Sequence, residues 1–225
     1  MKIDLLQQPD SAIAKIDMAP REEFLAEAGA MVAMSEWIQV NTTLRKGKGG
    51  GVLGGLKRMV AGESLFLSRF RTGADPGELF LAPTLMGDLL VYELTPTGLV
   101  VQSGSYLAST AAVDVDLGFQ GFKSLFSGES LFWLDLSGQG YVILSAFGAI
   151  YEVEVAGEYI VDTGHIVAFE KSLQFSISKA NPSWWGAMLG GEGLVCRFKG
   201  QGKVFCQTHN PTGFGGTVGS QLPPR

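Results

Sequence analysis

A short motif that recurs at nearly constant spacing is the feature that most constrains this chain. The sequence Gly-Glu-Ser-Leu-Phe begins at Gly62 and again at Gly128, and a relative, Gly-Glu-Gly-Leu-Val, begins at Gly191. The two offsets are 66 and 63 residues (128−62 and 191−128). A glycine-centred turn between apolar runs precedes each copy. These turns are centred on Gly29, Gly104 and Gly164. Landmarks that keep the same order three times indicate a threefold internal repeat.

Local patterns predict that each repeat is built of strands. Apolar and polar residues alternate over 113–117, 151–155 and 175–178, which is typical of half-buried antiparallel strands. Gly and Pro interrupt the chain at short intervals, which favours hairpins and leaves little room for long helices. We therefore expect a mainly β fold of three diverged β-units in a pseudo-threefold arrangement, as an antiparallel β barrel or sandwich with few short helices. In such an arrangement each unit can cover the exposed edge of its neighbour.

The repeat also predicts the domain organisation. We expect residues 1–225 to form a single domain, with internal repeats at about 20–96, 97–156 and 157–212. The last residues, 213–225, are expected to be a flexible tail. With 46% hydrophobic residues, the chain can bury a core large enough for one such domain.

Each Gly-Glu motif follows a glycine-containing segment with apolar residues at helical spacing. The residues of these stripes that we select as candidate contacts are Leu53, Leu56, Met59, Phe119, Phe122, Phe126, Trp184, Trp185 and Met188. Glycine costs a helix about 1 kcal/mol relative to alanine, so these turns need tertiary support. Two interpretations stay open: each stripe plugs one end of its β-unit, or the three gather on one face and contact a partner subunit or a membrane surface. Equivalent positions of the three repeats should lie at equivalent places in the fold. We therefore expect Trp184 and Trp185 on the same molecular face as Phe122 and Leu56.

The repeated turn motif itself is expected to be structural. It comprises Gly62, Glu63, Gly128, Glu129, Gly191 and Glu192. The three acids are equivalent under the repeat, so we expect one structural purpose served three times. A carboxylate that accepts backbone N–H groups at the turn is one candidate for that purpose, whereas a general base repeated three times is a poor alternative.

Composition and charge argue against several classes of function. The formal net charge is −5, and phosphate contacts need a basic surface, so we expect no nucleic-acid partner. The two cysteines, Cys196 and Cys206, lie in strand-like runs and are too few for a disulfide framework, which predicts buried free thiols. Residues 1–10 do not resemble a signal peptide, and no apolar run is long enough to span a membrane. We therefore expect a cytoplasmic protein.

The sequence predicts no catalytic, cofactor-binding or metal-binding residues. The two histidines, His165 and His209, do not lie in a zinc-binding spacing such as His-Glu-x-x-His. His165 lies in an apolar run, which favours a structural, hydrogen-bonded role over a catalytic one. The glycine-rich stretch 46–55 lacks the pattern of a phosphate-binding loop, and no Gly-x-Ser-x-Gly elbow occurs. We therefore expect no cofactor and no enzymatic activity.

Several segments together resemble the family of the altered-inheritance-of-mitochondria protein 24. They are 53–58 leading into 62–64, 104–109, 121–129, 162–169 and 207–211. The resemblance implies a β-rich fold similar to the tryptophan-RNA-binding attenuator protein (TRAP-like), and it implies no agreed activity for bacterial members. A yeast relative is linked to inner-membrane organisation, which supports a membrane role only by analogy.

These observations favour a non-enzymatic scaffold or interaction protein that is homo-oligomeric, as a trimer or another multiple. Peripheral association with a membrane surface through the glycine- and aromatic-rich segments is part of this hypothesis. The alternative is a small-ligand-binding sensor or regulator, because the fold that the chain resembles binds an amino acid between subunits. An undetected enzyme is a third hypothesis, and it would require an acid beside His165 or His209 in a pocket.

Overall fold

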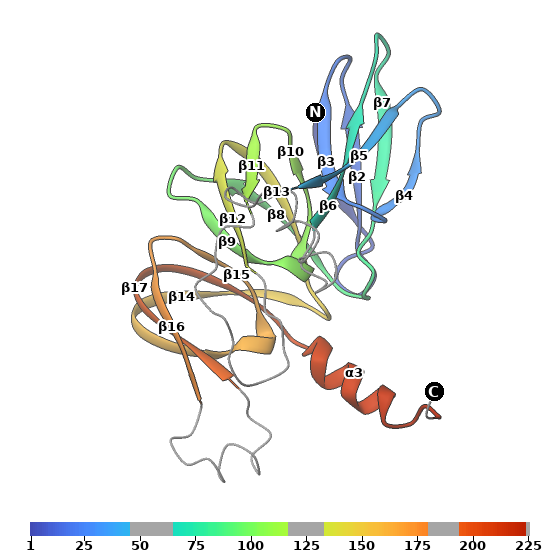
Figure 1. Ribbon diagram of the computed structural model, residues 1–225. Coiled ribbons are helices and arrows are strands. Elements are labelled where there is room, and N and C mark those ends of the chain that lie inside the picture. The colour runs from blue at the N-terminus through green and yellow to red at the C-terminus, as the bar shows by residue number, and fades with distance from the viewer. Residues whose placement is uncertain (46–64, 117–132, 180–193, 224–225) are drawn as a thin grey trace, which may run out of the picture.

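The chain forms strands through most of its described length (Figure 1). A computed structural model describes residues 1–45, 65–116, 133–179 and 194–223, and these form a mainly β protein. The strands are β1 (Lys2–Leu6), β2 (Ile13–Met18), β3 (Glu23–Glu27), β4 (Met31–Met34), β5 (Gln39–Arg45), β6 (Leu65–Arg71), β7 (Gly77–Leu81), β8 (Leu89–Leu94), β9 (Leu99–Gln102), β10 (Tyr106–Thr110), β11 (Val113–Asp116), β12 (Trp133–Gly138), β13 (Gly140–Ser145), β14 (Ile150–Asp162), β15 (Ile166–Glu170), β16 (Gln174–Lys179) and β17 (Leu194–Gln207). The other elements among these residues are the short helix α3 (Pro211–Gly219) and two 3₁₀ turns, η1 (Ser103–Ser105) and η2 (Thr163–His165). The expectation of a mainly β fold is confirmed.

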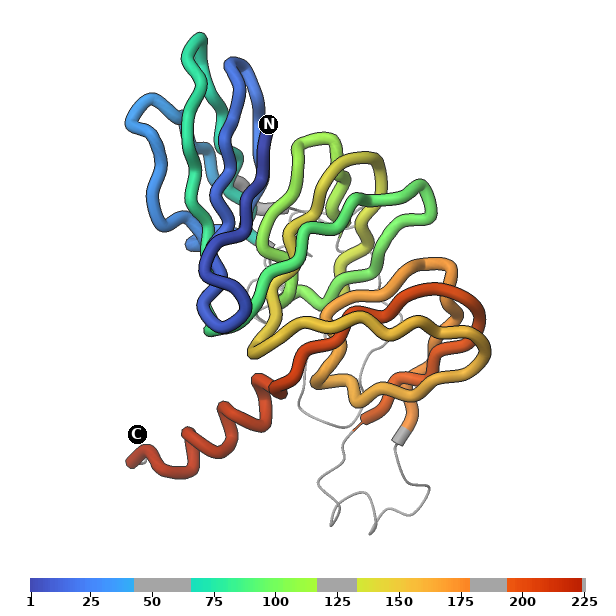
Figure 2. Tube along the Cα trace, turned by 180° about the vertical axis from the view of Figure 1, so that it is seen from behind, coloured from blue at the N-terminus to red at the C-terminus, as the bar shows by residue number. Residues whose placement is uncertain are grey.

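The strands form three antiparallel sheets. Their orders are β1-β2-β7-β4, β5-β6-β3-β10-β13-β8 and β11-β12-β9-β15-β17-β14, and β16 pairs with β17 in the third. All ladders between the named strands are antiparallel. Figure 2 shows that the layers follow one another through the molecule in chain order, from the N-terminal strands to the C-terminal ones.

One set of ladders occurs three times along the chain. In the first strand group (β2–β7), β2 and β4 flank β7, and β3 and β5 flank β6. In the second group (β8–β13), β8 and β10 flank β13, and β9 and β11 flank β12. In the third group (β14–β17), the long strands β14 and β17 each take the place of two strands. One half of β17 is flanked by β14 and β15, and the other half is flanked by β14 and β16. Neighbouring groups are joined by β3·β10 and β9·β15, which we call the inner junctions.

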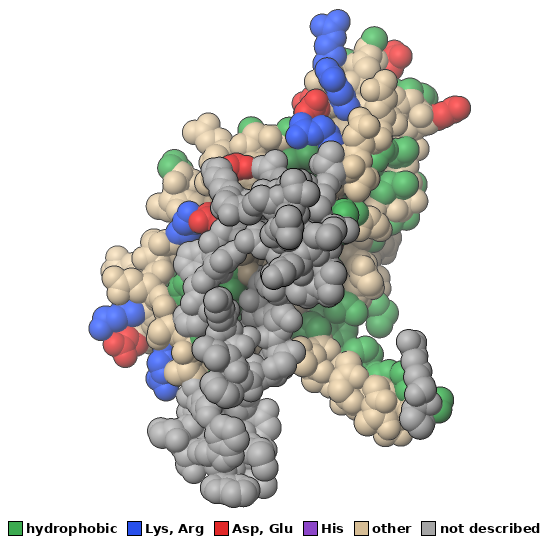
Figure 3. All heavy atoms as spheres, viewed as in Figure 1, with side chains coloured by type: hydrophobic (Ala, Val, Ile, Leu, Met, Phe, Trp, Pro, Cys, Tyr) green, Lys and Arg blue, Asp and Glu red, His purple; other side chains and the backbone are tan. Residues whose placement is uncertain are grey.

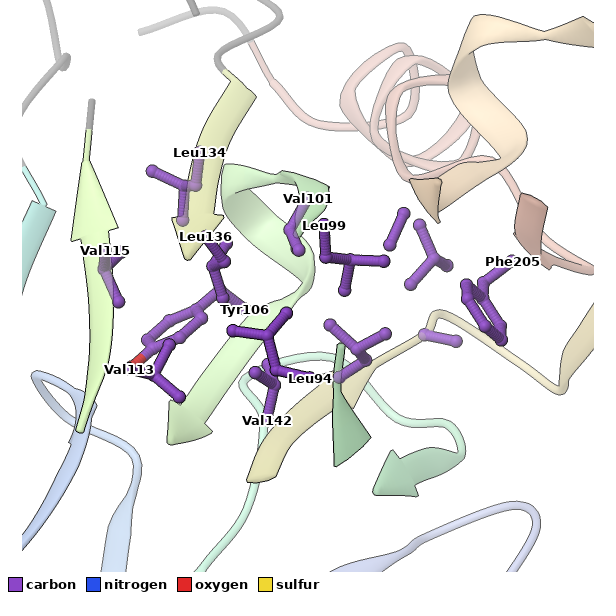
Figure 4. Packing of buried hydrophobic residues seen from close by; sticks show 14 of the residues in the cluster. Leu94, Leu99, Val101, Tyr106, Val113, Val115, Leu134, Leu136, Val142 and Phe205 are labelled. Carbon is purple, nitrogen blue, oxygen red and sulfur yellow. The ribbon is translucent and has the colours of Figure 1, made fainter. Parts of the chain in front are cut away.

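Each strand group surrounds a buried hydrophobic cluster to which neighbouring groups contribute. Figure 4 shows the cluster of the second group, which contains Leu99 and Tyr106 together with Phe205 from the third group. In the cluster of the third group, Trp133 comes from the second and packs edge-on against Phe169, with ring centroids 5.6 Å apart. Such aromatic pairs contribute about 0.5–1.5 kcal/mol beyond the burial of their surface. The three groups are therefore held together by shared cores as well as by ladders.

Local sequence explains the strands that line these cores. In β11 the side chains of Val113 and Val115 are buried, while Asp114 and Asp116 between them are half-buried. Successive side chains of a strand point to opposite faces, so the alternation in the sequence becomes one core-facing side and one solvent-facing side. The alternating stretches in β14 and β16 likewise form strands, as predicted.

Helix α3 forms over residues for which the sequence predicts a flexible tail. The side chain of Asn210 accepts hydrogen bonds from the backbone N–H groups of Thr212 and Gly213, at 2.9 and 3.2 Å. This cap satisfies two of the N–H groups that a helix start leaves free. The ring of Phe214 also packs on Phe147, with centroids 5.2 Å apart. Among the described residues, no helix is long and apolar enough to cross a bilayer.

Candidate functional site

Several strands end a sheet, and two of these unpaired edges occur where the corresponding strands of the other groups are paired. We call these two the outer edges. One is the free side of β4, which pairs only with β7. The other is the free side of 158–162 in β14, a stretch that pairs only with β17. Both expose apolar side chains, which are Met31 and Val32 on β4 and Tyr159 and Ile160 on β14. Figure 3 shows hydrophobic side chains gathered at the surface near β4.

The side chains of β4 differ in burial from those at the corresponding positions of β10 and β15. A one-residue shift in register marks the corresponding positions, at Val32 in β4, Leu107 in β10 and Val167 in β15. Val32 is 57% exposed, whereas the other two are 0% exposed. β3 pairs with the free side of β10, and β9 pairs with that of β15, whereas no described strand pairs with that of β4. Pairing with a neighbouring strand group therefore accounts for the difference.

The outer half of β14 shows the same contrast with β3 and β9. Ile160, Val100 and Leu25 each lie four residues before a turn glycine. Those glycines are Gly164, Gly104 and Gly29. Ile160 is 49% exposed, whereas Val100 is 1% and Leu25 is 4% exposed. Large apolar side chains at an unpaired edge are uncommon on proteins that act alone, because such edges invite pairing with another chain.

A cavity of about 360 Å³ lies where the three strand groups meet. Its lining includes Glu27 from the first group, Ser105 and Ser145 from the second, and Gln207 from the third. The carboxyl group of Glu27 has no hydrogen bond or ion pair within the described chain, and burial raises its pKa above the ordinary value of 4.5. Both serines are buried. The cavity therefore offers a desolvated carboxyl group beside small polar side chains.

The wall of this cavity is fixed by Gln207, whose side chain is 2% exposed. Its Nε2 donates to the carbonyl oxygen of Gly164 at 2.9 Å, and its Oε1 accepts from the backbone N–H of Phe147 at 2.9 Å. Both ends of the amide are thus used by the fold. Glu27 is left as the ionisable group of the lining that could meet a ligand.

The titratable groups that the sequence singles out have structural surroundings. The Nδ1 atom of His165 lies 2.8 Å from the carbonyl oxygen of Gln207, which fits the structural role expected for it. The ring of His209 packs against Phe147, with centroids 5.3 Å apart. Cys196 and Cys206 are free and buried, as predicted. Burial raises the pKa of Cys196 to about 12 and that of Cys206 to about 11.

The candidate contact residues that the sequence predicts lie outside the described residues. They are Leu53, Leu56, Met59, Phe119, Phe122, Phe126, Trp184, Trp185 and Met188. The repeated turn motif lies outside them as well: Gly62, Glu63, Gly128, Glu129, Gly191 and Glu192. Sequence reasoning missed the outer edges and the cavity. No local signal could have found the β4 edge, because its unbroken apolar run 31–34 has a parallel in the run 166–169 of β15, which is covered by β9.

Comparison with known proteins identifies the family. A family model described as Mitochondrial biogenesis AIM24 matches residues 3–209. This chain belongs to the AIM24 family. The match confirms the resemblance seen in the sequence, and it spans both outer edges and most of the cavity lining.

Two streptococcal proteins are similar to this AIM24 family member. An uncharacterized protein of Streptococcus pyogenes serotype M6 is 30% identical over 217 residues, which covers 94% of this chain and 87% of that protein. The crystal structure of a Streptococcus pyogenes protein, SPYM3_0169, matches with a TM-score of 0.78 at 26% identity, covering 98% of this chain and 99% of that one. The fold described above is therefore shared along nearly the whole chain.

Proposed function

We propose that this AIM24 family protein is a non-enzymatic scaffold that works by assembling with copies of itself. The observation that carries the proposal is the exposure of Val32 and Ile160 on the outer edges, at positions whose counterparts inside the chain are buried. Unpaired apolar edges are normally shortened, charged or covered in proteins that stay monomeric. Self-assembly covers both edges without any further partner.

Two other features support a scaffold. The threefold recurrence of the ladders fits three diverged units in a pseudo-threefold, TRAP-like arrangement. Three side chains that could serve in catalysis are engaged by the fold, because His165 is held by a backbone carbonyl and the thiols of Cys196 and Cys206 are buried with raised pKa values. A catalytic nucleophile or base instead needs a pKa near the working pH.

The size of the assembly tests the proposal directly. Light scattering coupled to size exclusion should give a discrete multiple of the chain mass of 24.0 kDa, with trimer as the first expectation. Sedimentation velocity over a range of protein concentrations should show the same species. A monomer throughout that range would contradict the proposal.

The scaffold proposal includes peripheral contact with a membrane surface. Among the described residues, the C-terminal segment supports it, since Phe214, Val218 and Leu222 are exposed along and just after α3. Apolar side chains on an exposed helix can enter the interfacial region of a bilayer. Pelleting the protein with anionic and with neutral liposomes at low salt tests this part, and recovery in the supernatant with both would remove it.

A second candidate function, a small-ligand sensor, is favoured by the cavity that Glu27 lines. Its volume of about 360 Å³ lies at the lower end of ligand sites, which measure about 300–1,000 Å³. A half-buried carboxyl group with no partner among the described residues would select a small molecule that carries hydrogen-bond donors. Such a ligand would bridge all three strand groups.

A thermal-shift screen of small amines, amino acids and polyols tests the sensor function. Wild type should be stabilised by at least one compound, and Glu27→Gln should lose that shift although its melting temperature without ligand is not lowered. No stabilising compound on well-folded protein would count against the sensor.

A further inference from the structure

We infer that the outer half of β14 pairs with β4 of a second copy of this chain, head to tail, in the register of the inner junctions. The inference rests on the proposed self-assembly and adds to it the surface, the partner and the register. The partner is a second copy of this chain for the following reason. Each outer edge lacks a neighbouring strand, and the strand that corresponds to this missing neighbour lies at the other end of the same chain.

Strand order supplies the first argument. In two sheets, strands of neighbouring groups are joined in the same way. The orders are β5-β6-β3·β10-β13-β8 and β11-β12-β9·β15-β17-β14. Two half-sheets remain without such a partner among the described residues: β4-β7-β2, which β1 extends on the far side of β2, and β16-β17-β14. Joining β14 to β4 would give β16-β17-β14·β4-β7-β2, which has the same order as the two complete sheets.

The inner junctions also specify the register. In β9·β15, Phe169 lies opposite Val100, and in β3·β10, Ser109 lies opposite Leu25. The residue that corresponds to Phe169 and Ser109 is Met34, two residues after the register shift in β4. Ile160 corresponds to Val100 and Leu25. The expected pairs are therefore Met34 with Ile160, and beside it Ala33 with Val161.

The hydrophobic clusters support this register independently. Val100 belongs to the buried cluster of the third group, which also contains Phe169 from the strand it pairs with. Met34, the counterpart of Phe169, already packs at the margin of the first group's cluster. Ile160, the counterpart of Val100, remains 49% exposed. Pairing in the inferred register would bring Ile160 of one copy to Met34 of the next and complete that cluster.

Charge disfavours the pairing of β14 with β14 of another copy. An antiparallel pair centred on Ile160 would place Glu158 of each copy opposite Asp162 of the other. Like charges directly opposite each other destabilise a sheet. β4 carries no charged residue over 31–34, so in the mixed pair neither Glu158 nor Asp162 lies opposite an acid of that strand.

Pairing has to take place between copies. Figures 1 and 2 show β4 and β14 at opposite ends of the molecule, with the second strand group between them. A head-to-tail contact is heterologous, and it forms a ring when its rotation closes or a filament when it does not. Only a closed ring leaves no outer edge free, so we expect a single cyclic species.

Disulfide trapping between two different single variants tests the inference. Met34→Cys and Ile160→Cys proteins are purified separately, mixed, dissociated and reassembled, and then oxidised. Directly opposed residues of antiparallel strands have Cα atoms about 4.5–5.5 Å apart, within the range of about 4.4–6.8 Å that a disulfide allows. We expect a linked dimer in the mixture and none from either variant alone. The native thiols are buried and should not interfere.

Controls keep the outcomes distinct. Ala33→Cys mixed with Val161→Cys is a second in-register pair in case Met34→Cys fails to fold. Met34→Cys mixed with Glu154→Cys, on the inner half of β14, should give no product. A linked dimer from one variant alone would overturn the head-to-tail contact. An assembled wild type with neither in-register pair linking would overturn the junction but leave self-assembly standing, whereas a monomeric wild type would overturn both.

Discussion

Inner junctions and outer edges use corresponding strands but differ in what lies beside them. Val32 on the outer edge and Val167 at an inner junction are the same amino acid at corresponding positions, yet they are 57% and 0% exposed. β15 has β9 along its free side, while β4 has no described strand there. The comparison shows that burial at these positions is set by the neighbouring strand and not by the side chain itself.

The contrast also explains why apolar residues occur at an exposed edge. A valine that stays exposed at an unpaired strand edge adds no stability through burial, and edges of this kind are prone to aggregation. The same residue contributes to a core once a strand lies beside it, at about 25 cal/mol per Å² of apolar surface buried. The outer edges therefore have the composition of an interface that is not yet formed.

The largest expected effect concerns stability at an inner junction. Leu107→Ala should lower the free energy of unfolding by about 2–5 kcal/mol, because a fully buried leucine leaves a cavity. Val32→Ala, at the corresponding outer position, should change the stability of the dissociated chain by less than about 0.5 kcal/mol. Urea titration at a concentration where the chain is monomeric measures both. Equal losses would break the comparison.

The next effect concerns assembly. Val32→Lys should weaken self-association at least tenfold, which corresponds to about 1.4 kcal/mol, because lysine at a sheet edge opposes pairing. The fold should be retained, since Val32 is exposed in the single chain. Tyr141→Lys, at an exposed position of β13 away from both outer edges, is the matched control. Sedimentation of both variants decides, and a Val32→Lys protein that assembles like wild type would refute the role of this edge.

A smaller effect concerns pH and the end of β3. Burial raises the pKa of Glu27 in the folded chain, so the folded state binds more protons than the unfolded state above pH 4.5. Stability should therefore fall as pH rises from that value through the folded pKa. Glu27→Gln should flatten this part of the stability curve. Asp162→Asn, at the corresponding position of the outer edge, is the control, and a wild-type curve that rises in this window would contradict the prediction.

The smallest effect separates the two thiols by their distance from the outer edge. Cys196 lies on β17 between β14 and β16, neither of which has a second partner strand among the described residues, whereas Cys206 lies between β14 and β15, and β15 is also paired with β9. Both should react slowly with iodoacetamide at pH 8, because their pKa values are raised to about 12 and about 11. Local opening at an unpaired edge is easier, so Cys196 should be alkylated faster in the dissociated chain. Peptide mass spectrometry measures both rates, and faster reaction at Cys206 would count against an open outer edge.

Much of the local structure could be predicted from the sequence. The alternation around Val113 fixes β11, and the strand-like runs around Cys196 and Cys206 fix two buried thiols on β17. Helix α3 could not be predicted, because its glycines argue against a helix and its start depends on the Asn210 cap and on packing against Phe147. The Glu27 cavity was equally out of reach, since its lining comes from all three strand groups.

The sequence by itself determined the strand class and the spacing of the turns, because both depend on the order of residues within a few positions of each other. Tertiary structure decided which strand edges are covered, because each inner junction joins residues far apart in the chain, such as Ala26 with Ala108. Nothing in the local sequence around Val32 or Val167 distinguishes a free edge from a covered one. The physical reason is that a strand's free N–H and C=O groups are satisfied by whichever strand lies beside it, and that neighbour is chosen by the fold.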